Sequence, residues 1–241
     1  MTDDELAAHL ATDAGRILLD IQRSGQFEGQ QLGDEGDHAA NAYLCAALRQ
    51  ARPADGLLSE EEKDCLTRCS VSRVWIVDPL DGTREYREGR GDWAVHVALA
   101  IDGIPRAGAV ALPALGTTLS SANPPPLCAA NQPLKMLVSR TRPAPEAIAV
   151  AEKLGAELLP MGSAGAKAMA VVRGEADIYL HTGGQYEWDN CAPIAVAQAA
   201  GLHCSRIDGT PVRYNNPDPY LPDLLICRPE LLPAIMSALA A

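Results

Sequence analysis

Two aspartates that follow an apolar run are the first residues able to do chemistry. The run Val-Trp-Ile-Val (residues 74–77) is typical of a buried strand, and Asp-Pro-Leu-Asp-Gly-Thr follows it directly. Charge at the end of a buried strand is costly unless something compensates it. Because Gly82 permits a tight bend, Asp78 and Asp81 could point to one spot together with the Leu80 carbonyl. Two carboxylates and a backbone oxygen are ligands that suit Mg²⁺.

Two further acidic segments extend this candidate site. The triplet Glu-Glu-Glu (residues 60–62) follows a short strand predicted at residues 57–58, and adjacent strands could bring Glu60 beside the two aspartates. A run of glutamates is otherwise the solvated start of a helix, just as an isolated Asp-Gly is otherwise a turn. Asp189 precedes a helix expected over residues 192–200, and its alternative role is to cap that helix.

The composition indicates a globular protein with a sizeable core. The chain has 241 residues, of which 47% are hydrophobic and 21% are charged, and its formal net charge is −11. This charge argues against binding of a nucleic acid polymer or of an anionic membrane surface. An acidic protein that handles phosphates needs metal ions or a few local lysines and arginines at its site.

Several features predict a cytoplasmic protein. The first residues lack the basic and apolar segments of a secretory signal, and no uncharged apolar stretch is long enough to cross a bilayer. The seven cysteines are odd in number and scattered, so we expect reduced and mostly buried thiols. Cys191 lies two residues after Asp189, and its oxidation could link redox state to activity.

Apolar periodicity predicts two helices before the apolar strand. Apolar residues over 4–23 recur at the spacing of one helix face, and the polar residues 24–33 interrupt the pattern. A second helix is expected over residues 38–51. Asp34 and Asp37 precede it, and acidic residues in that position usually cap a helix.

The remaining pattern predicts two joined lobes. A short helical turn over residues 84–90 leads to a hairpin of strands at 93–101 and 107–112, and residues 120–133 carry no periodicity. Beyond them strands and helices alternate, at residues 137–139, 144–154, 157–161, 163–172, 177–180, 192–200, 224–227 and 230–240. We therefore expect one lobe over 1–122, a connection over 123–133 and a second lobe over 134–241, built as an α/β or α+β layered sandwich.

Three motifs in this order resemble the inositol monophosphatase superfamily of Mg²⁺-dependent, lithium-sensitive phosphatases. They are Glu60-Glu61, the Asp-Pro-Leu-Asp-Gly-Thr segment of residues 78–83, and Trp-Asp-Asn-Cys-Ala-Pro over residues 188–193. The resemblance spans nearly the whole chain. It implies an α+β fold, an alternating α-β-α-β-α sandwich with two sheets, in which the first lobe binds metal and the second carries the substrate pocket.

The resemblance also implies roles for individual residues. The metal ligands for two or three Mg²⁺ ions would be Glu60, Asp78, the Leu80 carbonyl, Asp81 and Asp189. A water held by these ions would attack phosphorus in line, as paired metals permit.

Three residues would support that water, and two backbone N–H groups would bind the phosphate. Glu60 and Thr83 would orient and activate the water, with Asp37 holding the Thr83 hydroxyl. The backbone N–H groups of Gly82 and Thr83 would bind phosphate oxygens. Two departures from the family pattern occur: residues 32–37 keep little beyond the final Asp37, and Ser59 replaces the usual glycine before the glutamates.

The segment Gly-Ser-Ala-Gly-Ala-Lys (residues 162–167) would line the substrate pocket. Its lysine resembles the bisphosphate nucleotidase branch, called CysQ in bacteria and especially its actinobacterial members, because a second phosphate needs a further cation. The alternative for Lys167 is a lysine on a solvated helix face, and the alternative for His181 is a histidine packed at a strand end. The candidate substrate-binding residues are Gly82, Thr83, Gly162, Ser163, Lys167, Arg140 and His181.

These features predict a Mg²⁺-dependent phosphatase with a small phosphorylated nucleotide as substrate. It would convert 3′-phosphoadenosine 5′-phosphate, and also its sulfated form 3′-phosphoadenosine 5′-phosphosulfate, by removing the 3′-phosphate, with a role in sulfate assimilation. The alternatives are an inositol monophosphate or fructose 1,6-bisphosphate phosphatase, and a non-catalytic protein that binds metal or nucleotide. Many relatives form dimers, so a homodimer is one of the assemblies considered, although the sequence does not specify the oligomeric state.

Overall fold

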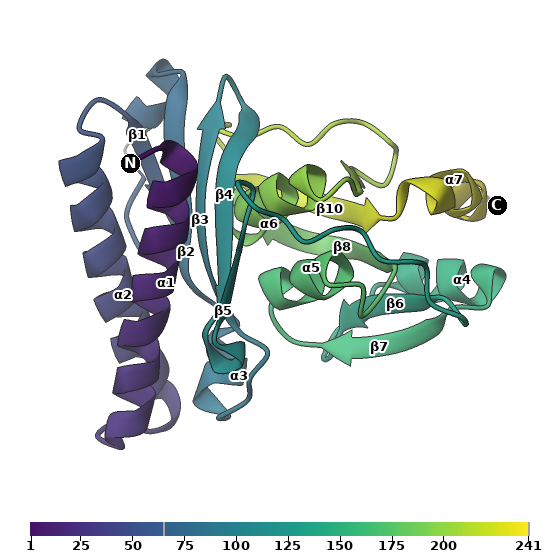
Figure 1. Ribbon diagram of the computed structural model, residues 1–241, viewed down its shortest axis with the longest axis horizontal. Helices are drawn as coiled ribbons and strands as arrows, with labels where there is room; N and C mark the ends of the chain where they lie inside the picture. Colours follow the sequence, from purple (N-terminus) through teal and green to yellow (C-terminus); the bar gives the residue numbers. More distant parts are fainter. Residues whose placement is uncertain (65, 241) are drawn as a thin grey trace.

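Two five-stranded sheets organise the chain (Figure 1). The structure, a computed structural model, describes residues 1–64 and 66–240. In the first sheet β1 runs parallel to β2 and the other neighbours are antiparallel. Its order is β1 (Gly56–Ser59), β2 (Arg73–Asp81), β3 (Ala94–Ile101), β4 (Ile104–Leu112) and β5 (Thr117–Ser120). The second sheet is mixed, in the order β7 (Glu157–Met161), β6 (Lys135–Ser139), β8 (Ile178–Tyr186), β10 (Tyr220–Cys227) and β9 (His203–Ser205).

Helices fill the space around and between the sheets, which gives five layers (Figure 1). α1 (Asp3–Ser24) and α2 (Gly29–Ala51) cover the outer face of the first sheet. α5 (Ala164–Val172) and α6 (Glu187–Ala199) lie between the sheets, and α4 (Pro145–Leu154) and α7 (Leu232–Ala240) cover the second sheet. The expected α-β-α-β-α order with two sheets is confirmed. Short helical turns occur at α3 (Thr83–Arg87), Thr67–Ser70, Pro113–Leu115 and Pro229–Leu231.

Alternation along β2 decides which side chains reach the middle layer. Trp75 and Val77 pack in the core beneath α1 and α2, whereas Val74 and Ile76 pack in the core that includes α5 and α6. Successive side chains of a strand point to opposite faces, so Asp78 continues the second set and faces the middle layer.

The second helix begins nine residues earlier than its periodicity predicts. It starts at Gly29 rather than at residue 38, so Asp34 and Asp37 lie within the helix and the capping role expected for them is wrong. Glycine disfavours a helix by about 1 kcal/mol relative to alanine, which explains the error. Here Gly33 and Gly36 let α2 pack closely: a Cβ at Gly33 would lie 2.8 Å from Thr83 Cγ2. Tertiary packing therefore overrides local preference.

Other boundaries differ in the second lobe. α6 begins at Glu187 instead of residue 192, and β8 continues to Tyr186 instead of ending at residue 180. Glycines obscure the longer strand, because Gly183 and Gly184 adopt positive φ angles of 98° and 95° inside it. The short strands β5 and β9 were not predicted. No helix in the described part of the chain is long and apolar enough to span a membrane.

Candidate metal centre

A bulge in β2 turns two aspartates to the same side of the first sheet. Asp78 pairs with His96 on β3 and Asp81 pairs with Ala94, so three steps along β2 match two along β3. Residues three apart on a regular strand would face opposite sides, and one extra residue reverses that parity. Asp78 Oδ1 accepts a hydrogen bond from the Leu80 backbone N–H at 3.1 Å, within the bulge. Both aspartates consequently face the middle layer.

Asp189 joins this pair from the second lobe. It lies in the first turn of α6, where its Oδ2 accepts a hydrogen bond of 2.6 Å from the Tyr186 backbone N–H. The capping role considered for Asp189 is therefore present, at a helix start five residues earlier than expected. One carboxylate oxygen from each of Asp78, Asp81 and Asp189 lies within 4.8 Å of the other two.

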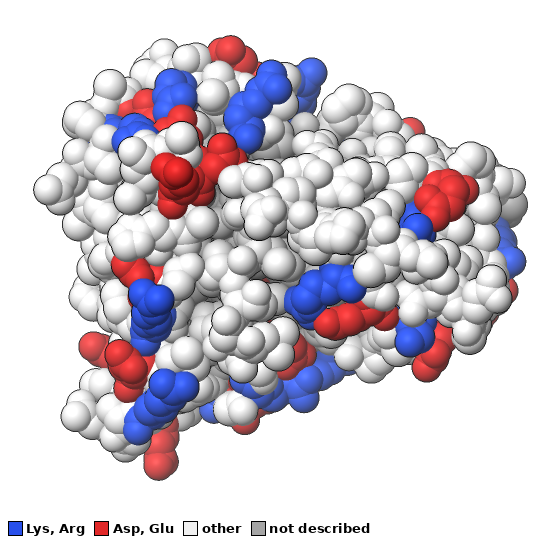
Figure 2. Space-filling view, in the orientation of Figure 1, with Lys and Arg blue, Asp and Glu red and all other residues white. Residues whose placement is uncertain are grey.

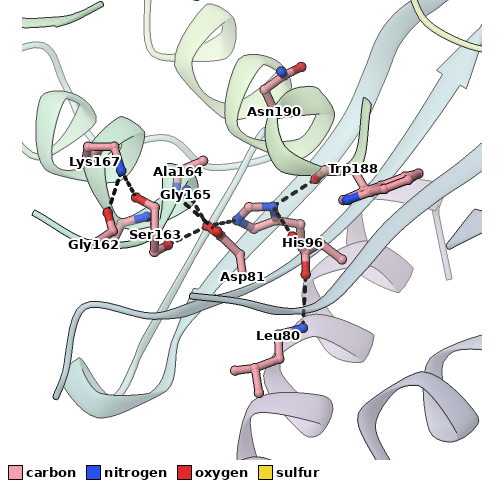
Figure 3. Close-up of polar contacts among 12 residues, drawn as sticks. Leu80, Asp81, His96, Gly162, Ser163, Ala164, Gly165, Lys167, Trp188 and Asn190 are labelled. Atoms are coloured by element: carbon pink, nitrogen blue, oxygen red, sulfur yellow. Dashed lines mark hydrogen bonds and ion pairs between the residues drawn. The ribbon is translucent and has the colours of Figure 1, made fainter. Parts of the chain in front are cut away.

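The Asp81 carboxylate connects β2 to the N-terminus of α5 (Figure 3). Its Oδ2 accepts hydrogen bonds from the Ser163 hydroxyl and from the Gly165 backbone N–H, the latter at 2.6 Å. Its Oδ1 accepts from the Ala164 backbone N–H at 3.1 Å. A carboxylate is stabilised by the free N–H groups of a helix start. Each carboxylate oxygen has two lone pairs, so Oδ1 keeps one that is directed elsewhere.

His96 is a member of the site that sequence reasoning missed. It is fully buried, with Nε2 3.2 Å from Asp81 Oδ2 and Nδ1 3.0 Å from the Trp188 carbonyl oxygen (Figure 3). Nδ1 also lies 4.0 Å from Asp78 Oδ2. The Nε2–Asp81 contact lacks the alignment of a regular hydrogen bond, so it acts through charge. The feature that could have identified His96 is its pairing with Asp78, and that pairing is known only once the β2–β3 register is known.

Glu60 and Asp37 approach the three aspartates from neighbouring elements. Ser59 on β1 pairs with Val77 on β2, so Glu60 follows β1 beside Asp78. The pKa of Glu60 rises to about 8, first because its carboxyl group loses water and then through the charges of Asp189 and others. Burial and neighbouring negative charges likewise raise the pKa of Asp37 to about 7, although a hydrogen bond from Thr83 opposes this.

The electrostatics of the cluster fit a hard cation. Burial, followed by Glu60 and Asp81, raises the pKa of Asp78 well above its usual value, and burial and then Asp81 raise the pKa of Asp189 to about 6. Asp81 differs: burial raises its pKa, but the charge of His96 and hydrogen bonds from Ser163 and Gly165 together lower it to about 2. These donors are all oxygen atoms, which suit Mg²⁺, Mn²⁺ or Ca²⁺. The cluster could therefore hold a divalent cation.

The backbone candidates lie at the start of α3. The Thr83 hydroxyl donates to the Leu80 carbonyl oxygen at 3.2 Å. Gly82 precedes the helix with φ of 90°, a conformation that favours glycine. A Cβ at this position would lie 3.1 Å from Ser163 Cβ, so the turn is packed against the start of α5. The metal and phosphate roles of these residues stay predictions.

Lys167 is buried rather than solvated. Its Nζ donates to the backbone carbonyl oxygens of Gly162 and Ser163, at 2.5 and 2.7 Å (Figure 3). It also lies 5.3 Å from the centre of the Tyr179 ring. Burial lowers the pKa of Lys167 to about 8. The alternative of a lysine on a solvated helix face is therefore wrong, and its contact with substrate stays a prediction.

The other predicted pocket residues lie in two adjoining cavities. Arg140 donates to Glu85 and Glu88, each at 2.8 Å, and lines a pocket of about 290 Å³ together with Gly162, Ser163 and Lys167. His181 lines a separate pocket of about 190 Å³. Burial lowers the pKa of His181 to about 4, and the positive charges of Lys167 and Arg142 add to this.

The surface charge is dispersed on the face that Figure 2 shows. Lysines and arginines lie singly or beside acidic residues there, without a continuous basic region. The net charge of −11 agrees with this pattern. A nucleic acid polymer requires a basic stripe or patch, which this face does not offer.

Comparisons with known proteins give consistent matches. The chain matches the Inositol monophosphatase family over residues 4–240. A 3′-phosphoadenosine 5′-phosphate phosphatase of Mycobacterium leprae (strain TN) is 47% identical over 254 residues, which cover 99% of this chain and 94% of that protein. The 3′(2′),5′-bisphosphate nucleotidase CysQ of Escherichia coli (strain K12) is 29% identical, covering 77% of this chain and 80% of that protein. The crystal structure of CysQ from Bacteroides thetaiotaomicron has a TM-score of 0.78 at 25% identity, covering 92% of this chain and 96% of that one.

Proposed function

Because this chain belongs to the inositol monophosphatase family, we propose that it is a Mg²⁺-dependent phosphatase that converts 3′-phosphoadenosine 5′-phosphate to AMP and phosphate. The observation that carries the proposal is the cluster of Asp78, Asp81 and Asp189, whose oxygens lie within 4.8 Å of one another. The substrate is supported by the 47% identity to the mycobacterial protein named for that activity.

Mg²⁺ would be held by these three aspartates, with Glu60 and the Leu80 carbonyl completing the set and two or three ions sharing it. When bound, Mg²⁺ neutralises phosphate oxygens and makes a water molecule more acidic. The Leu80 carbonyl accepts from the Thr83 hydroxyl. A hydroxyl has one proton to donate, so a cation at the carbonyl would turn that proton toward Asp37, which is also its partner.

Thr83, Asp37 and Glu60 would prepare the attacking water. With its proton donated to Asp37, the Thr83 oxygen accepts a hydrogen bond from the water and orients it. Glu60 follows β1 beside Asp78, so its carboxylate would accept the proton that the attacking water loses. The water oxygen bonds to phosphorus as the bond from phosphorus to the 3′ oxygen breaks. The proton that the water loses to Glu60 returns through solvent to the 3′ oxygen, which leaves as the hydroxyl of AMP.

The same chemistry could serve other phosphate esters. Inositol monophosphate and fructose 1,6-bisphosphate are the alternative substrates, and 3′-phosphoadenosine 5′-phosphosulfate is an additional one. A protein that only binds metal or nucleotide is the alternative of another class. The identity to the mycobacterial phosphatase favours the nucleotide bisphosphate.

A phosphate-release panel tests the proposal. Purified protein is incubated with the four esters, with Mg²⁺, with EDTA, and with EDTA followed by excess Mg²⁺. We expect the highest kcat/KM with 3′-phosphoadenosine 5′-phosphate, loss of release with EDTA and recovery with Mg²⁺. A higher kcat/KM with inositol monophosphate would contradict the substrate, and phosphate release that EDTA leaves unchanged would contradict the metal.

Compartment and assembly stay predictions. The six cysteines among the described residues are free, which supports a reducing compartment such as the cytoplasm, where a by-product of sulfate assimilation would arise. A homodimer is tested by light scattering of the purified protein.

A further inference from the structure

A basic pocket adjoins the metal centre. It has a volume of about 290 Å³, close to the lower end of ligand pockets. Four basic side chains and one acidic side chain line it: Arg84, Arg140, Arg142, Lys167 and Glu85. A local excess of positive charge is unusual in a chain whose net charge is −11. The pocket is therefore suited to an anion.

Two of these four basic side chains already have partners within the protein. Arg140 pairs with Glu85 and Glu88, so its charge is neutralised within the pocket wall. Lys167 directs Nζ at the carbonyl oxygens of Gly162 and Ser163 and is 5% exposed. Both side chains consequently hold the wall together.

The other two cations are free. Among the described residues, the guanidinium groups of Arg84 and Arg142 have no hydrogen-bond or ion-pair partner, and both residues are exposed. The positive charge of Arg142 also reaches His181 in the neighbouring cavity, where it helps to lower the pKa of that histidine. A guanidinium group matches the geometry of a phosphate group and can donate two parallel hydrogen bonds to it.

The pocket shares a wall with the aspartate cluster. Ser163 lines the pocket and donates its hydroxyl hydrogen to Asp81. Arg84 follows Thr83 directly and thus stands at the start of α3, beside the bulge that carries Asp78 and Asp81. A molecule with two phosphate groups could place one at the cluster and the other in the pocket.

We propose that Arg84 and Arg142 bind the phosphate group that is not hydrolysed, the 5′-phosphate of a nucleoside 3′,5′-bisphosphate, and thereby select bisphosphates over monophosphates. This inference rests on the proposed function and assigns specificity to residues other than Lys167. Lys167 and Arg140 are positioning residues: they fix the wall formed by Gly162, Ser163 and Glu85.

The test compares 3′-phosphoadenosine 5′-phosphate with adenosine 3′-monophosphate, which lacks the 5′-phosphate. For Arg84→Gln and for Arg142→Gln we expect kcat/KM for the bisphosphate to fall by about tenfold to a hundredfold, mainly through KM, because each loses a charge-assisted hydrogen bond. The loss with adenosine 3′-monophosphate should be at least about tenfold smaller. Arg84→Lys should recover part of the preference, because the charge returns without the planar fork.

A product and a matched arginine complete the experiment. AMP retains the 5′-phosphate, so its inhibition constant should rise in the double variant, which combines Arg84→Gln with Arg142→Gln. The inhibition constant of adenosine should stay the same. Arg16 on α1, with 71% of its side chain exposed, provides the control: Arg16→Gln should leave both substrates unaffected. Thermal unfolding of each variant verifies folding.

Three results would overturn the inference, and they differ from one another. If the wild-type protein releases phosphate from neither adenosine phosphate, the proposed function and this inference both fail. If it hydrolyses both equally well, the proposed hydrolysis stands and only this inference fails. If the wild-type protein prefers the bisphosphate and the double variant keeps that preference, only the assignment of the pocket fails.

Discussion

The Nε2 atom of His96 lies 3.2 Å from Oδ2 of Asp81, and both side chains are buried. The other ring nitrogen, Nδ1, faces the Trp188 carbonyl oxygen. Both neighbours are oxygen acceptors, which suits the imidazolium form: Nδ1–H donates to the carbonyl oxygen, and the positive charge at Nε2 attracts the Asp81 carboxylate without an aligned hydrogen bond. Burial opposes that charge, but Asp81 raises the pKa of His96 above its usual value. The positive charge of His96 thus compensates the negative charge of the Asp81 carboxylate.

Replacing His96 should destabilise the protein. In His96→Gln the Asp81 carboxylate loses its buried counter-charge, and breaking a buried pair costs roughly 3–5 kcal/mol. Mg²⁺ supplies positive charge to the same carboxylates, so it should restore part of the lost stability. Urea unfolding with and without Mg²⁺ measures both effects. His9→Gln is the control, because its contact with Asp13 is exposed and contributes at most about 1 kcal/mol. Equal unfolding midpoints for wild type and His96→Gln would contradict this role.

Asp81 and Asp189 should respond differently to the same substitution. Asp81→Asn removes charge from the centre and also presents an amide N–H₂ to the backbone N–H groups of α5, so activity should fall by several orders of magnitude and stability should fall with it. Asp189 accepts from one backbone N–H, at Tyr186. Asp189→Asn should therefore weaken Mg²⁺ binding with a smaller loss of stability. Calorimetric titration with Mg²⁺ and thermal unfolding separate the two. Unchanged Mg²⁺ affinity in both variants would contradict the metal centre.

Sequence reasoning was most successful where chemistry is local. The apolar run before Asp78 predicts a strand, and Pro79 and Gly82 predict that the strand ends in a tight turn. The structure has both the strand and the turn. Bringing the two side chains to one face, however, depends on a bulge against β3. The bulge is a property of the pairing, so the sequence of β2 could suggest the convergence of the aspartates but could not derive it.

Two features of the site depend on packing that no short segment contains. His96 lies within an apolar strand and reads as a core residue, and its role follows from contacts with Asp81 and with Trp188, 92 positions away in the chain. Lys167 lies in a segment that suggested a phosphate ligand, yet the backbone folds around its amino group. The second helix shows the same limit, because its glycines become favourable only when α3 packs against them.

Without metal, the stability of the protein should fall as pH rises. Burial and mutual repulsion raise the pKa of Glu60 to about 8, of Asp37 to about 7 and of Asp189 to about 6. A carboxyl group with a higher pKa in the folded than in the unfolded chain binds more protons when folded. Its effect is therefore absent below the unfolded value near 4, and stability is lost progressively as pH rises through the folded values.

Magnesium should reverse this trend. The rise in Tm on adding Mg²⁺ should be larger at pH 8, where these groups are ionised, than at pH 5, where protons compete with the metal. Thermal unfolding across this range measures the difference, with KCl at equal ionic strength as the control. A shift in Tm that is independent of pH would contradict the assignment of these carboxyl groups to the centre.

Cys191 should be inert despite its place beside Asp189. It is fully buried, and burial raises the pKa of its thiol well above the usual value, whereas thiol reactivity requires the thiolate. Cys128 is exposed. A mild thiol reagent should modify Cys128 before Cys191 and leave activity unchanged, which peptide mass spectrometry and phosphate release measure. The variant Cys128→Ser identifies that signal, and rapid labelling of Cys191 in the folded protein would revive the redox hypothesis.

Gly165 should tolerate no side chain while His96 is present. A Cβ at Gly165 would lie 2.0 Å from His96 Nε2, and α5 cannot easily shift because its first N–H groups donate to Asp81. Gly165→Ala should therefore lower the activity. It should also lower the free energy of unfolding by about 1–3 kcal/mol, the usual cost of overpacking. In a His96→Ala background the clash disappears, so the same substitution should cost less. Unfolding of the four proteins of this double-mutant cycle gives the coupling energy. A coupling near zero would mean that the helix and the histidine are positioned independently, against the contacts described above.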